Sequence, residues 1–587
     1  MNRRHFLSST AIAGGASFLS RASVAQTLQD CPAGAKLSPV PRTQDHLYRP
    51  KPQFWSFDNA DPVLRVGPFH VSFQVFTVGE DENSYGLSRD HVRVQQEGQR
   101  WTVEATQLAS AGQQMQHEGS LQAVFSQERD GSFRCLVRAS APEKLRAVKM
   151  RLHALPPAQV FQTGWNIDPN GLPVTADGMN FIYPEYQGGM PAWQLAYAQG
   201  SLGIVSDDVE PRPKRLTAYL QSGQVTIDLV HEEDARRFAN SMEVPAWELH
   251  PNASLLEVIA RRQQILEQRA GLVVWEKRND VPAWARQVKL VVTLHGMHWS
   301  GYIFNDYRRM QQAVKWVCKR IPGNEVVFHL AGWEGRYYRK YGNSKADERM
   351  GGAAGLHTLV RAAQANGAHV LPFYSGNYPT PGLPGYETYG PSSVFESTNG
   401  FRWDPMRGYV VDWGQLRGTG MSGGGPALNP GAPAWRDHLI EQIAKLNEEF
   451  GFDGAYFDTQ PSADNDGRYS ALDGFRTIAE QLRARRPEFL IASESWFDLS
   501  LPFVPWSQTP DGPMRWTRKY QRRFAHLSMG EPSRGSTGVH ELGHVPYDRG
   551  ELDRMFDIAT ISLVDGTLDQ AADEVDRVVR KAHVAKV

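Results

Sequence analysis

The chain has 587 residues, which at roughly 150 residues per domain suggests two to four domains. Its 63 Lys and Arg and 64 Asp and Glu give a formal net charge of −1, so no overall basic field would attract nucleic acid or an anionic membrane surface. The longest apolar stretch, near residues 11–19, is too short for stable membrane insertion, and three cysteines are too few for a disulfide-rich scaffold. We therefore expect a soluble multidomain protein that is stabilised by its hydrophobic core.

Residues 1–25 have the three-part layout of an export signal. Arg3 and Arg4 precede a short, weakly hydrophobic run, and Ser23 and Ala25 supply the small residues of a cleavage site. The segment resembles a twin-arginine signal peptide, which implies a periplasmic or secreted protein; a basic N-terminus without this role is the alternative. Because this route carries folded proteins, a bound cofactor is permitted but not required, and we expect none.

Residues 26–280 are expected to form an antiparallel β-sandwich domain with a linker helix. Apolar residues alternate with period two in several short runs, such as residues 63–66, 69–78 and 92–94. Asp-Gly at 130–131 and Ser-Gly at 222–223 each separate two such runs, which predicts hairpin turns. A helical segment at 255–268 leads to the second half of the chain.

Residues 281–587 change to short apolar runs that alternate with helices, a pattern typical of βα units around a parallel sheet. Five candidate strands are nearly continuously apolar, as strands buried on both faces should be: residues 288–294, 325–330, 369–374, 452–457 and 489–492. A Gly- and Pro-rich insertion at about 375–430 follows the third strand, and weaker strand-like residues lie near 524–528 and 558–563. We predict an α/β fold, a (β/α)8 TIM barrel, whose last three strands are poorly defined by pattern.

Two carboxylates, Asp458 and Glu494, end the fourth and fifth predicted strands. Because the C-terminal ends of barrel strands meet at one mouth, both side chains should face a shared cleft. Burial and mutual repulsion raise one pKa, so one group can act as an acid while the other stays ionised, as glycosidic-bond cleavage requires. The alternative is structural: Asp458 caps the following helix, and Glu494 pairs with an arginine such as Arg402 or Arg515.

Three other aspartates have a weaker claim to function. Asp453 precedes the apolar run of the fourth strand, so we expect it at the opposite strand end in a structural role. Asp464 and Asp466 could contact calcium, but their spacing lacks the full acidic loop and its distal glutamate. A solvated turn is the favoured interpretation.

Four motifs add a family resemblance: residues 329–334 (HLAGWE), 372–374 (PFY), 452–458 (FDGAYFD) and 492–495 (ASES). Over about residues 290–500 they resemble the catalytic barrel of glycoside hydrolases, and are most similar to the endo-α-N-acetylgalactosaminidase-like group and related retaining enzymes with an N-terminal β-sandwich. The resemblance implies that Asp458 is the nucleophile and Glu494 the acid/base of a retaining double displacement. The chain is shorter than those multidomain enzymes, so no particular sugar is carried over.

Aromatic and polar residues near the predicted strand ends are candidates for sugar binding, because sugar rings pack their C–H faces on aromatic side chains. The aromatic candidates are Trp299, Trp333, Tyr374, Trp403 and Trp496. His295 and Glu334 could hydrogen-bond substrate hydroxyl groups. Ordinary packing is the alternative for each aromatic residue, and a supporting structural role is the alternative for His295 and Glu334.

His540-Glu541-Leu542-Gly543-His544 matches the H-E-x-x-H pattern of zinc metalloproteases. Nearby glycines and Pro546 leave little room for the helix that this motif requires. We expect no metal here, and place His540 and Glu541 at the end of a late strand, lining the sugar cleft.

The sequence therefore predicts an exported glycosidase that acts on an oligosaccharide or glycoconjugate. A zinc metalloprotease and a non-catalytic carbohydrate-binding protein are the alternatives. The sugar, the linkage and the oligomeric state are not determined by these patterns.

Overall fold

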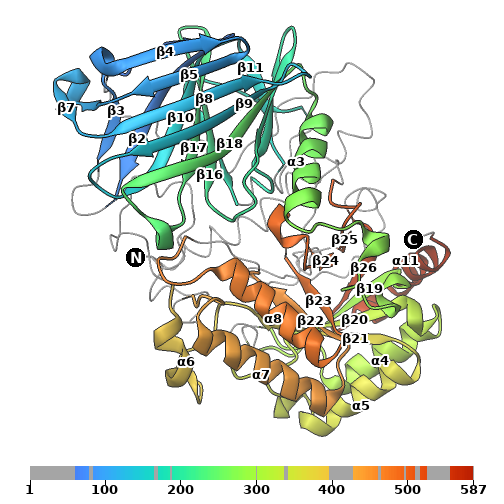
Figure 1. Cartoon of the computed structure of the whole chain (residues 1–587). Coiled ribbons are helices and arrows are strands. Elements are labelled where there is room, and N and C mark those ends of the chain that lie inside the picture. Colours follow the sequence, from blue (N-terminus) through green and yellow to red (C-terminus); the bar gives the residue numbers. More distant parts are fainter. Residues whose placement is uncertain are drawn as a thin grey trace.

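The computed structural model describes residues 60–78, 83–163, 170–184, 188–298, 301–335, 341–395, 427–460, 465–494, 497–508, 516–524 and 556–585. These residues form an antiparallel, β-rich N-terminal part and a C-terminal part in which helices cover a parallel sheet (Figure 1). Within these ranges no helix is both long and apolar enough to cross a membrane.

In the described residues, two antiparallel sheets of nine strands each form the N-terminal part. The first has the order β13-β16-β17-β10-β2-β3-β6-β7, with β1 beside β2. Its strands are β1 (Leu64–Val66), β2 (Phe69–Thr77), β3 (Ser84–Leu87), β6 (Leu108–Ser110), β7 (Met115–His117), β10 (Leu145–Leu155), β13 (Met179–Tyr183), β16 (Lys214–Gln221) and β17 (Gln224–Glu232).

The second sheet has the order β12-β11-β14-β15-β18-β9-β8-β5-β4. Its strands are β4 (Val92–Glu97), β5 (Arg100–Ala105), β8 (Ser120–Gln127), β9 (Phe133–Ser140), β11 (Ala158–Phe161), β12 (Leu172–Pro173), β14 (Ala192–Tyr197), β15 (Ser201–Ser206) and β18 (Ser241–Pro251). Alternate residues of β9 are buried, and Cys135 Sγ lies 3.6 Å from Met150 Sδ of the first sheet, so the two sheets pack face to face.

Both predicted hairpins are present. The turn between β8 and β9 contains Gly131 (φ 84°), and the turn between β16 and β17 contains Gly223 (φ 77°). These left-handed angles favour glycine, so the glycine residues fix where each strand reverses.

Helix α3 (Leu255–Arg269) follows the sandwich, as the sequence predicts. It begins with a capping box in which the Ser254 hydroxyl accepts a hydrogen bond from the Glu257 N–H, while the Glu257 carboxylate accepts one from the Ser254 N–H. Its buried side chains include Val258, Ile259 and Leu266.

The C-terminal part is built on an eight-stranded parallel sheet with the order β25-β24-β23-β22-β21-β20-β19-β26. The strands are β19 (Leu290–His295), β20 (Val326–Ala331), β21 (His369–Ser375), β22 (Gly454–Asp458), β23 (Leu490–Ser493), β24 (Trp506–Ser507), β25 (Arg522–Arg523) and β26 (Ala559–Leu563). The five predicted apolar strands are confirmed to within a few residues. The two-residue β24 was not predicted, because it is too short to show a periodic pattern.

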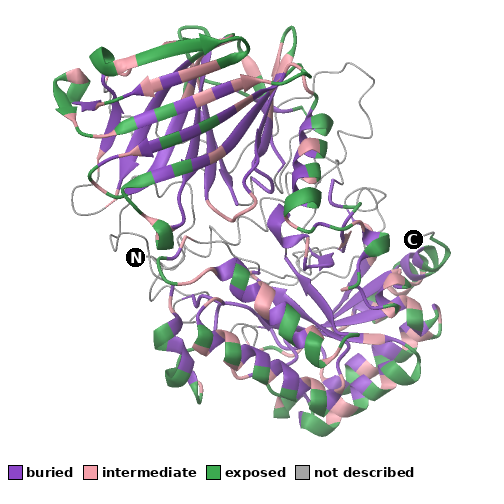
Figure 2. Ribbon diagram, viewed as in Figure 1, coloured by how far each residue is buried: buried purple, intermediate pink, exposed green. Residues whose placement is uncertain are grey.

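The helices beside this sheet are α4 (Tyr307–Cys318), α5 (Gly352–Ala365), α6 (Tyr386–Ser393), α7 (Pro433–Phe450), α8 (Ala471–Arg485), α10 (Thr567–Gln570) and α11 (Ala572–Val584). They expose one face and bury the other, whereas the strands are buried along their length (Figure 2). The predicted helix α7 ends at Gly451, whose φ of 76° closes the last turn.

The parallel sheet curls strongly. The rings of His329 on β20 and Phe524, which directly follows β25, lie 6.1 Å apart although their strands are far apart in the sheet order. An isolated parallel bridge pairs Phe524 with Ile558, directly before β26. One face of the sheet therefore forms an inner core, which includes Phe373, Tyr456 and Trp506.

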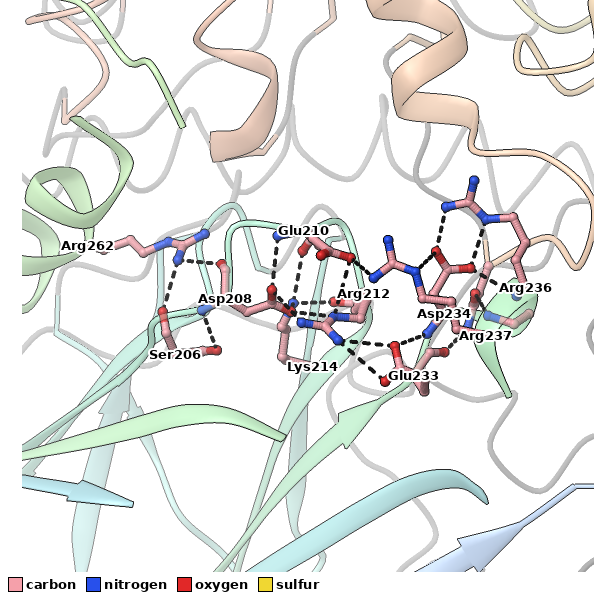
Figure 3. Close-up of polar contacts among 12 residues, drawn as sticks. Ser206, Asp208, Glu210, Arg212, Lys214, Glu233, Asp234, Arg236, Arg237 and Arg262 are labelled. Atoms are coloured by element: carbon pink, nitrogen blue, oxygen red, sulfur yellow. Dashed lines mark hydrogen bonds and ion pairs between the residues drawn. The ribbon is translucent and has the colours of Figure 1, made fainter. Parts of the chain in front are cut away.

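Charged side chains of the sandwich gather where it meets the C-terminal part (Figure 3). Arg212 donates to the Asp208 carboxylate at 2.9 Å and to Glu233 at 3.1 Å. From the C-terminal part, the Asn465 side chain accepts a hydrogen bond from the Ala235 N–H at 2.8 Å. Polar contacts thus join the two parts.

A buried ion pair is the deepest of these contacts. Arg262 on α3 donates to Asp498 Oδ2 at 2.7 Å, and both side chains are fully buried. Tyr183 of β13 donates its hydroxyl to Asp498 Oδ1 at 2.7 Å, and Arg262 also donates to the carbonyl oxygens of Ser206 and Asp208. Because Asp498 lies five residues beyond the end of β23, this contact fixes a loop of the parallel sheet against the sandwich.

We expect Arg262→Met to lower the free energy of unfolding by roughly 3–5 kcal/mol, because it leaves the Asp498 carboxylate buried and without its cation. Urea denaturation measures this loss. The matched control is Arg138→Met, which removes an exposed ion pair with Glu243 and should cost at most about 1 kcal/mol. Equal losses in the two variants would contradict the importance of the buried pair.

Candidate active site

The site is set by the pairing of β22 with β23. These parallel strands match Tyr456 with Ala492 and Phe457 with Ser493. The next position on each strand therefore places Asp458 beside Glu494. Every second residue of a strand lies on the same face. Asp458 and Glu494 are each two residues beyond an inner-core residue, Tyr456 and Ala492, so both acids are on the inward face. The structure thus brings the two predicted carboxylates together at one end of the inner core.

Both carboxylates are almost completely buried, with 2% of Asp458 and 6% of Glu494 exposed. The Thr459 N–H donates to Glu494 Oε2 at 2.8 Å. Thr459 has a φ of 56°, which is rare for a β-branched residue and marks backbone strain. The Thr459 hydroxyl lies within hydrogen-bonding reach of Asn377 Oδ1 and, at 2.7 Å, of the Asp458 carbonyl oxygen. These contacts orient the turn after β22 toward Glu494.

Burial raises the pKa of the Glu494 carboxyl group to about 7, although the hydrogen bond from Thr459 acts in the opposite direction. Near neutral pH a large fraction of Glu494 is therefore protonated. Because Oε2 accepts the Thr459 N–H, Oε1 can hold the proton. Glu494 is thus suited to donate a proton to a ligand at this end of the sheet.

Asp458 does not cap helix α8, the structural role that the sequence leaves open for it. Helix α8 is capped by Ser470, whose hydroxyl accepts a hydrogen bond from the Asp473 N–H. Arg402 and Arg515, the arginines considered as partners of Glu494, lie outside the described residues.

His295 is the last residue of β19. It lies an even number of residues from Val291, which belongs to the inner core, so both are on the inward face of the strand. The strand register places His295 level with Tyr456, which lies two residues before Asp458 on the same face of β22. Burial and the neighbouring His298 and His329 lower the pKa of His295 to about 3, so its imidazole is neutral. His295 therefore contributes an uncharged polar group to the inner core.

Trp333 and Tyr374, which the sequence places near strand ends as candidates for sugar binding, lie in a packed layer of the structure. Their rings pack edge to face at 5.9 Å in the layer between the sheet and its helices, and both are almost completely buried. The Trp333 indole donates to the Phe373 carbonyl oxygen at 3.0 Å. Ordinary packing, the alternative interpretation, describes these two residues.

Glu334 is also buried, with 2% exposed. Burial first, and then the charge of Glu334, raises the pKa of the Tyr374 phenol well above its usual value. Glu334 therefore lies near the Trp333–Tyr374 pair.

Five predicted site residues lie outside the described residues: Trp299, Trp403, Trp496, His540 and Glu541. His544, the last residue of the zinc-type motif, lies there as well. Within the described residues, no cluster of His, Cys, Asp or Glu forms a set of metal ligands.

Asp453 has the structural position that the sequence predicts. Its carboxylate accepts a hydrogen bond from the Val370 N–H at 2.9 Å, and His369 Nδ1 lies 3.5 Å from it. Asp453 thus ties β22 to β21 at the end opposite Asp458. Asp466 accepts hydrogen bonds from the N–H groups of Arg468 and Tyr469, which is the geometry of a turn.

Sequence reasoning missed Thr459 and its hydrogen-bond partner Asn377. It also missed Gln508, which lies level with Glu494 because β23 and β24 pair Ser493 with Ser507. Thr459 directly follows Asp458, so its position alone could have suggested a role. Gln508 directly follows the short strand β24, which gave no periodic signal.

Comparisons with known proteins show the fold. No family model matches the chain, and no curated protein matches its sequence. The structure is similar to an alpha-N-acetylgalactosaminidase from Bifidobacterium bifidum in complex with GalNAc (TM-score 0.57, 13% identity, 85% of this chain and 80% of that chain). The ligand-free form of that enzyme gives a TM-score of 0.55 at 13% identity, covering 89% of this chain and 93% of that chain.

An alpha-galactosidase from Lactobacillus brevis is also similar, with a TM-score of 0.52 and 12% identity, covering 93% of this chain and 79% of that chain. At these identities the likeness concerns the overall arrangement of the β-rich part and the parallel sheet. The chain therefore shares its fold with these glycosidases.

The raised pKa of Glu494 predicts a pH-dependent stability. Between the ordinary value of 4.5 and about 7, the native state holds a proton that the unfolded chain has released, so rising pH destabilises the wild type. Glu494→Gln removes this effect. Relative to the wild type, the variant should gain up to about 3 kcal/mol across this window. Urea denaturation at pH values below 4.5, between 4.5 and 7, and above 7 measures this gain. A difference in the free energy of unfolding between variant and wild type that does not change with pH would contradict the prediction.

Proposed function

We propose that this protein is a glycoside hydrolase that uses Asp458 and Glu494. The observation that carries the proposal is the in-register placement of two buried carboxyl groups at one end of the inner core. One of them has a pKa near 7, which suits a general acid. The shared fold with solved glycosidases supports the same conclusion.

We propose further that the parallel sheet is a closed (β/α)8 barrel. Strands β19 to β25 are neighbours in chain order, and β26 lies on the free side of β19, so pairing of β25 with β26 would close the sheet. The Phe524 N–H donates to the Ser507 carbonyl oxygen at 2.9 Å, and the Ile558 N–H donates to the Arg523 carbonyl oxygen at 3.0 Å. These hydrogen bonds support closure between β24, β25 and β26, with Asp458 and Glu494 at the end where barrel enzymes bind substrate.

The proposed mechanism is a retaining double displacement. The Asp458 carboxylate attacks the anomeric carbon as the bond to the leaving oxygen breaks, and Glu494 transfers its proton to that oxygen. Water then attacks the glycosyl–Asp458 ester, Glu494 takes up the proton of that water, and the Asp458 carboxylate is released. Neighbouring parallel strands lie roughly 4.8 Å apart, which favours the short carboxyl separation of retaining enzymes, about 5 Å.

The proposed substrate is an oligosaccharide or glycoconjugate with an α-linked galactose or N-acetylgalactosamine residue. This class follows from the names of the structurally similar enzymes and from the sequence resemblance to the endo-α-N-acetylgalactosaminidase-like group. We also propose export through the twin-arginine route, on the sequence of residues 1–25. No observation favours the zinc metalloprotease or the non-catalytic binding protein.

Replacing either acid should abolish turnover without unfolding the protein. We expect Asp458→Asn to reduce kcat by at least about 1000-fold, because no nucleophile remains. The assay is a panel of aryl α-glycosides of galactose and N-acetylgalactosamine, with mass spectrometry to detect a glycosyl adduct on Asp458. The matched control, Asp453→Asn, alters the other end of β22 and should retain turnover. Wild-type activity of Asp458→Asn would refute the mechanism.

Glu494→Gln should reveal its role through the leaving group. We expect a loss of roughly 10²–10⁴-fold on substrates with a sugar leaving group, and a much smaller loss in the glycosylation step with dinitrophenyl glycosides, whose leaving group needs no proton. Wild-type turnover should fall as the pH rises through about 7, where Glu494 loses its proton. If the glycosylation rate of Glu494→Gln still falls as the pH rises through about 7, the titrating group is not Glu494.

A further inference from the structure

Gln508 lies one strand further along the sheet from Glu494. Strands β23 and β24 pair Ser493 with Ser507, and the Gln508 N–H continues the ladder by donating to the Ser493 carbonyl oxygen at 3.0 Å. The next matched position is therefore Glu494 beside Gln508. Gln508 lies two residues after Trp506, which belongs to the inner core, so it is on the same inward face. Asp458 thus ends β22, whereas Glu494 and Gln508 directly follow the last residues of β23 and β24. All three continue the inward-facing series of three successive strands.

The side-chain amide of Gln508 is fully buried, yet neither Oε1 nor Nε2 forms a hydrogen bond within the part of the chain that the structure describes. The large majority of buried side-chain polar atoms in proteins are hydrogen-bonded, so a buried amide with no partner among the described residues needs an explanation. Gln521, on the neighbouring segment, offers a comparison: it is equally buried, but its Nε2 donates to the Val504 carbonyl oxygen at 2.9 Å.

We propose that Gln508 is a substrate-binding residue that recognises an uncharged hydroxyl group of the sugar held between Asp458 and Glu494. A carboxamide offers both a donor and an acceptor, as a hydroxyl group does, so the two can exchange hydrogen bonds without a buried charge. The substrate would thus supply the hydrogen-bond partners that the Gln508 amide lacks among the described residues. This inference rests on the proposed glycosidase function and deepens it by assigning a specificity residue.

The test compares Gln508→Met with Gln521→Met. Methionine keeps nearly the same volume but has no amide, so it separates hydrogen bonding from packing. Thermal unfolding should give Gln508→Met a Tm equal to or above that of the wild type, because the substitution removes no side-chain hydrogen bond with the residues that the structure describes. Gln521→Met should lower Tm, because it leaves the Val504 carbonyl oxygen without its donor.

Recognition is then measured with the aryl glycoside that the wild type hydrolyses fastest and with its monodeoxy analogues. For one hydroxyl position, the wild type should lose about 5- to 30-fold in kcat/KM on removal of the hydroxyl. Gln508→Met should lose that discrimination at this position only, and Gln521→Met should keep it. Unchanged discrimination in Gln508→Met, with hydrolysis intact, overturns the role of Gln508 alone.

Failure of the proposed function gives a different result. If the wild type hydrolyses no glycoside of the panel, binding of the methyl glycosides and their deoxy analogues is measured by calorimetry. Sugar binding that loses the same hydroxyl discrimination in Gln508→Met supports Gln508 and refutes catalysis. Absence of both hydrolysis and binding overturns both proposals.

Discussion

The register between β22 and β23 is the constraint on which the candidate site depends. A slip of one residue would turn Asp458 or Glu494 toward the outer layer, where Phe457 and Ile491 pack under the helices. Gly454 helps to fix this register, because a Cβ atom there would lie 2.4 Å from the Leu490 carbonyl oxygen. Close packing between β22 and β23 therefore determines which side chains lie together at the end of the inner core.

The same end of the sheet concentrates features that cost stability. Two carboxyl groups are buried together, Thr459 holds a left-handed backbone angle, and the Gln508 amide is buried. Each disfavours the folded chain. Their grouping at one end of an otherwise well-packed core is typical of a site that is organised for a ligand rather than for stability.

The sandwich contributes to this organisation. Asp498 lies four residues after Glu494, and it is held by Arg262 on α3 and Tyr183 on β13. Burial first, and then the charge of Asp498, raises the pKa of the Tyr183 phenol well above its usual value, so the phenol remains a neutral donor. The Asp498 N–H also donates to the Gly189 carbonyl oxygen at 2.8 Å. The N-terminal part thus fixes the loop that follows the strand bearing Glu494.

The sequence by itself determined the sandwich hairpins, helices α3 and α7, five strands of the parallel sheet, and the positions of Asp458 and Glu494 at strand ends, because continuous apolar runs and turn residues record local burial. Only the tertiary structure placed Trp333 and Tyr374 in the outer layer and Gln508 beside Glu494. It also raised the pKa of Glu494. Local patterns indicate that a segment is buried, but hydrogen-bond register between distant segments decides which side chains meet and how far water is excluded from them.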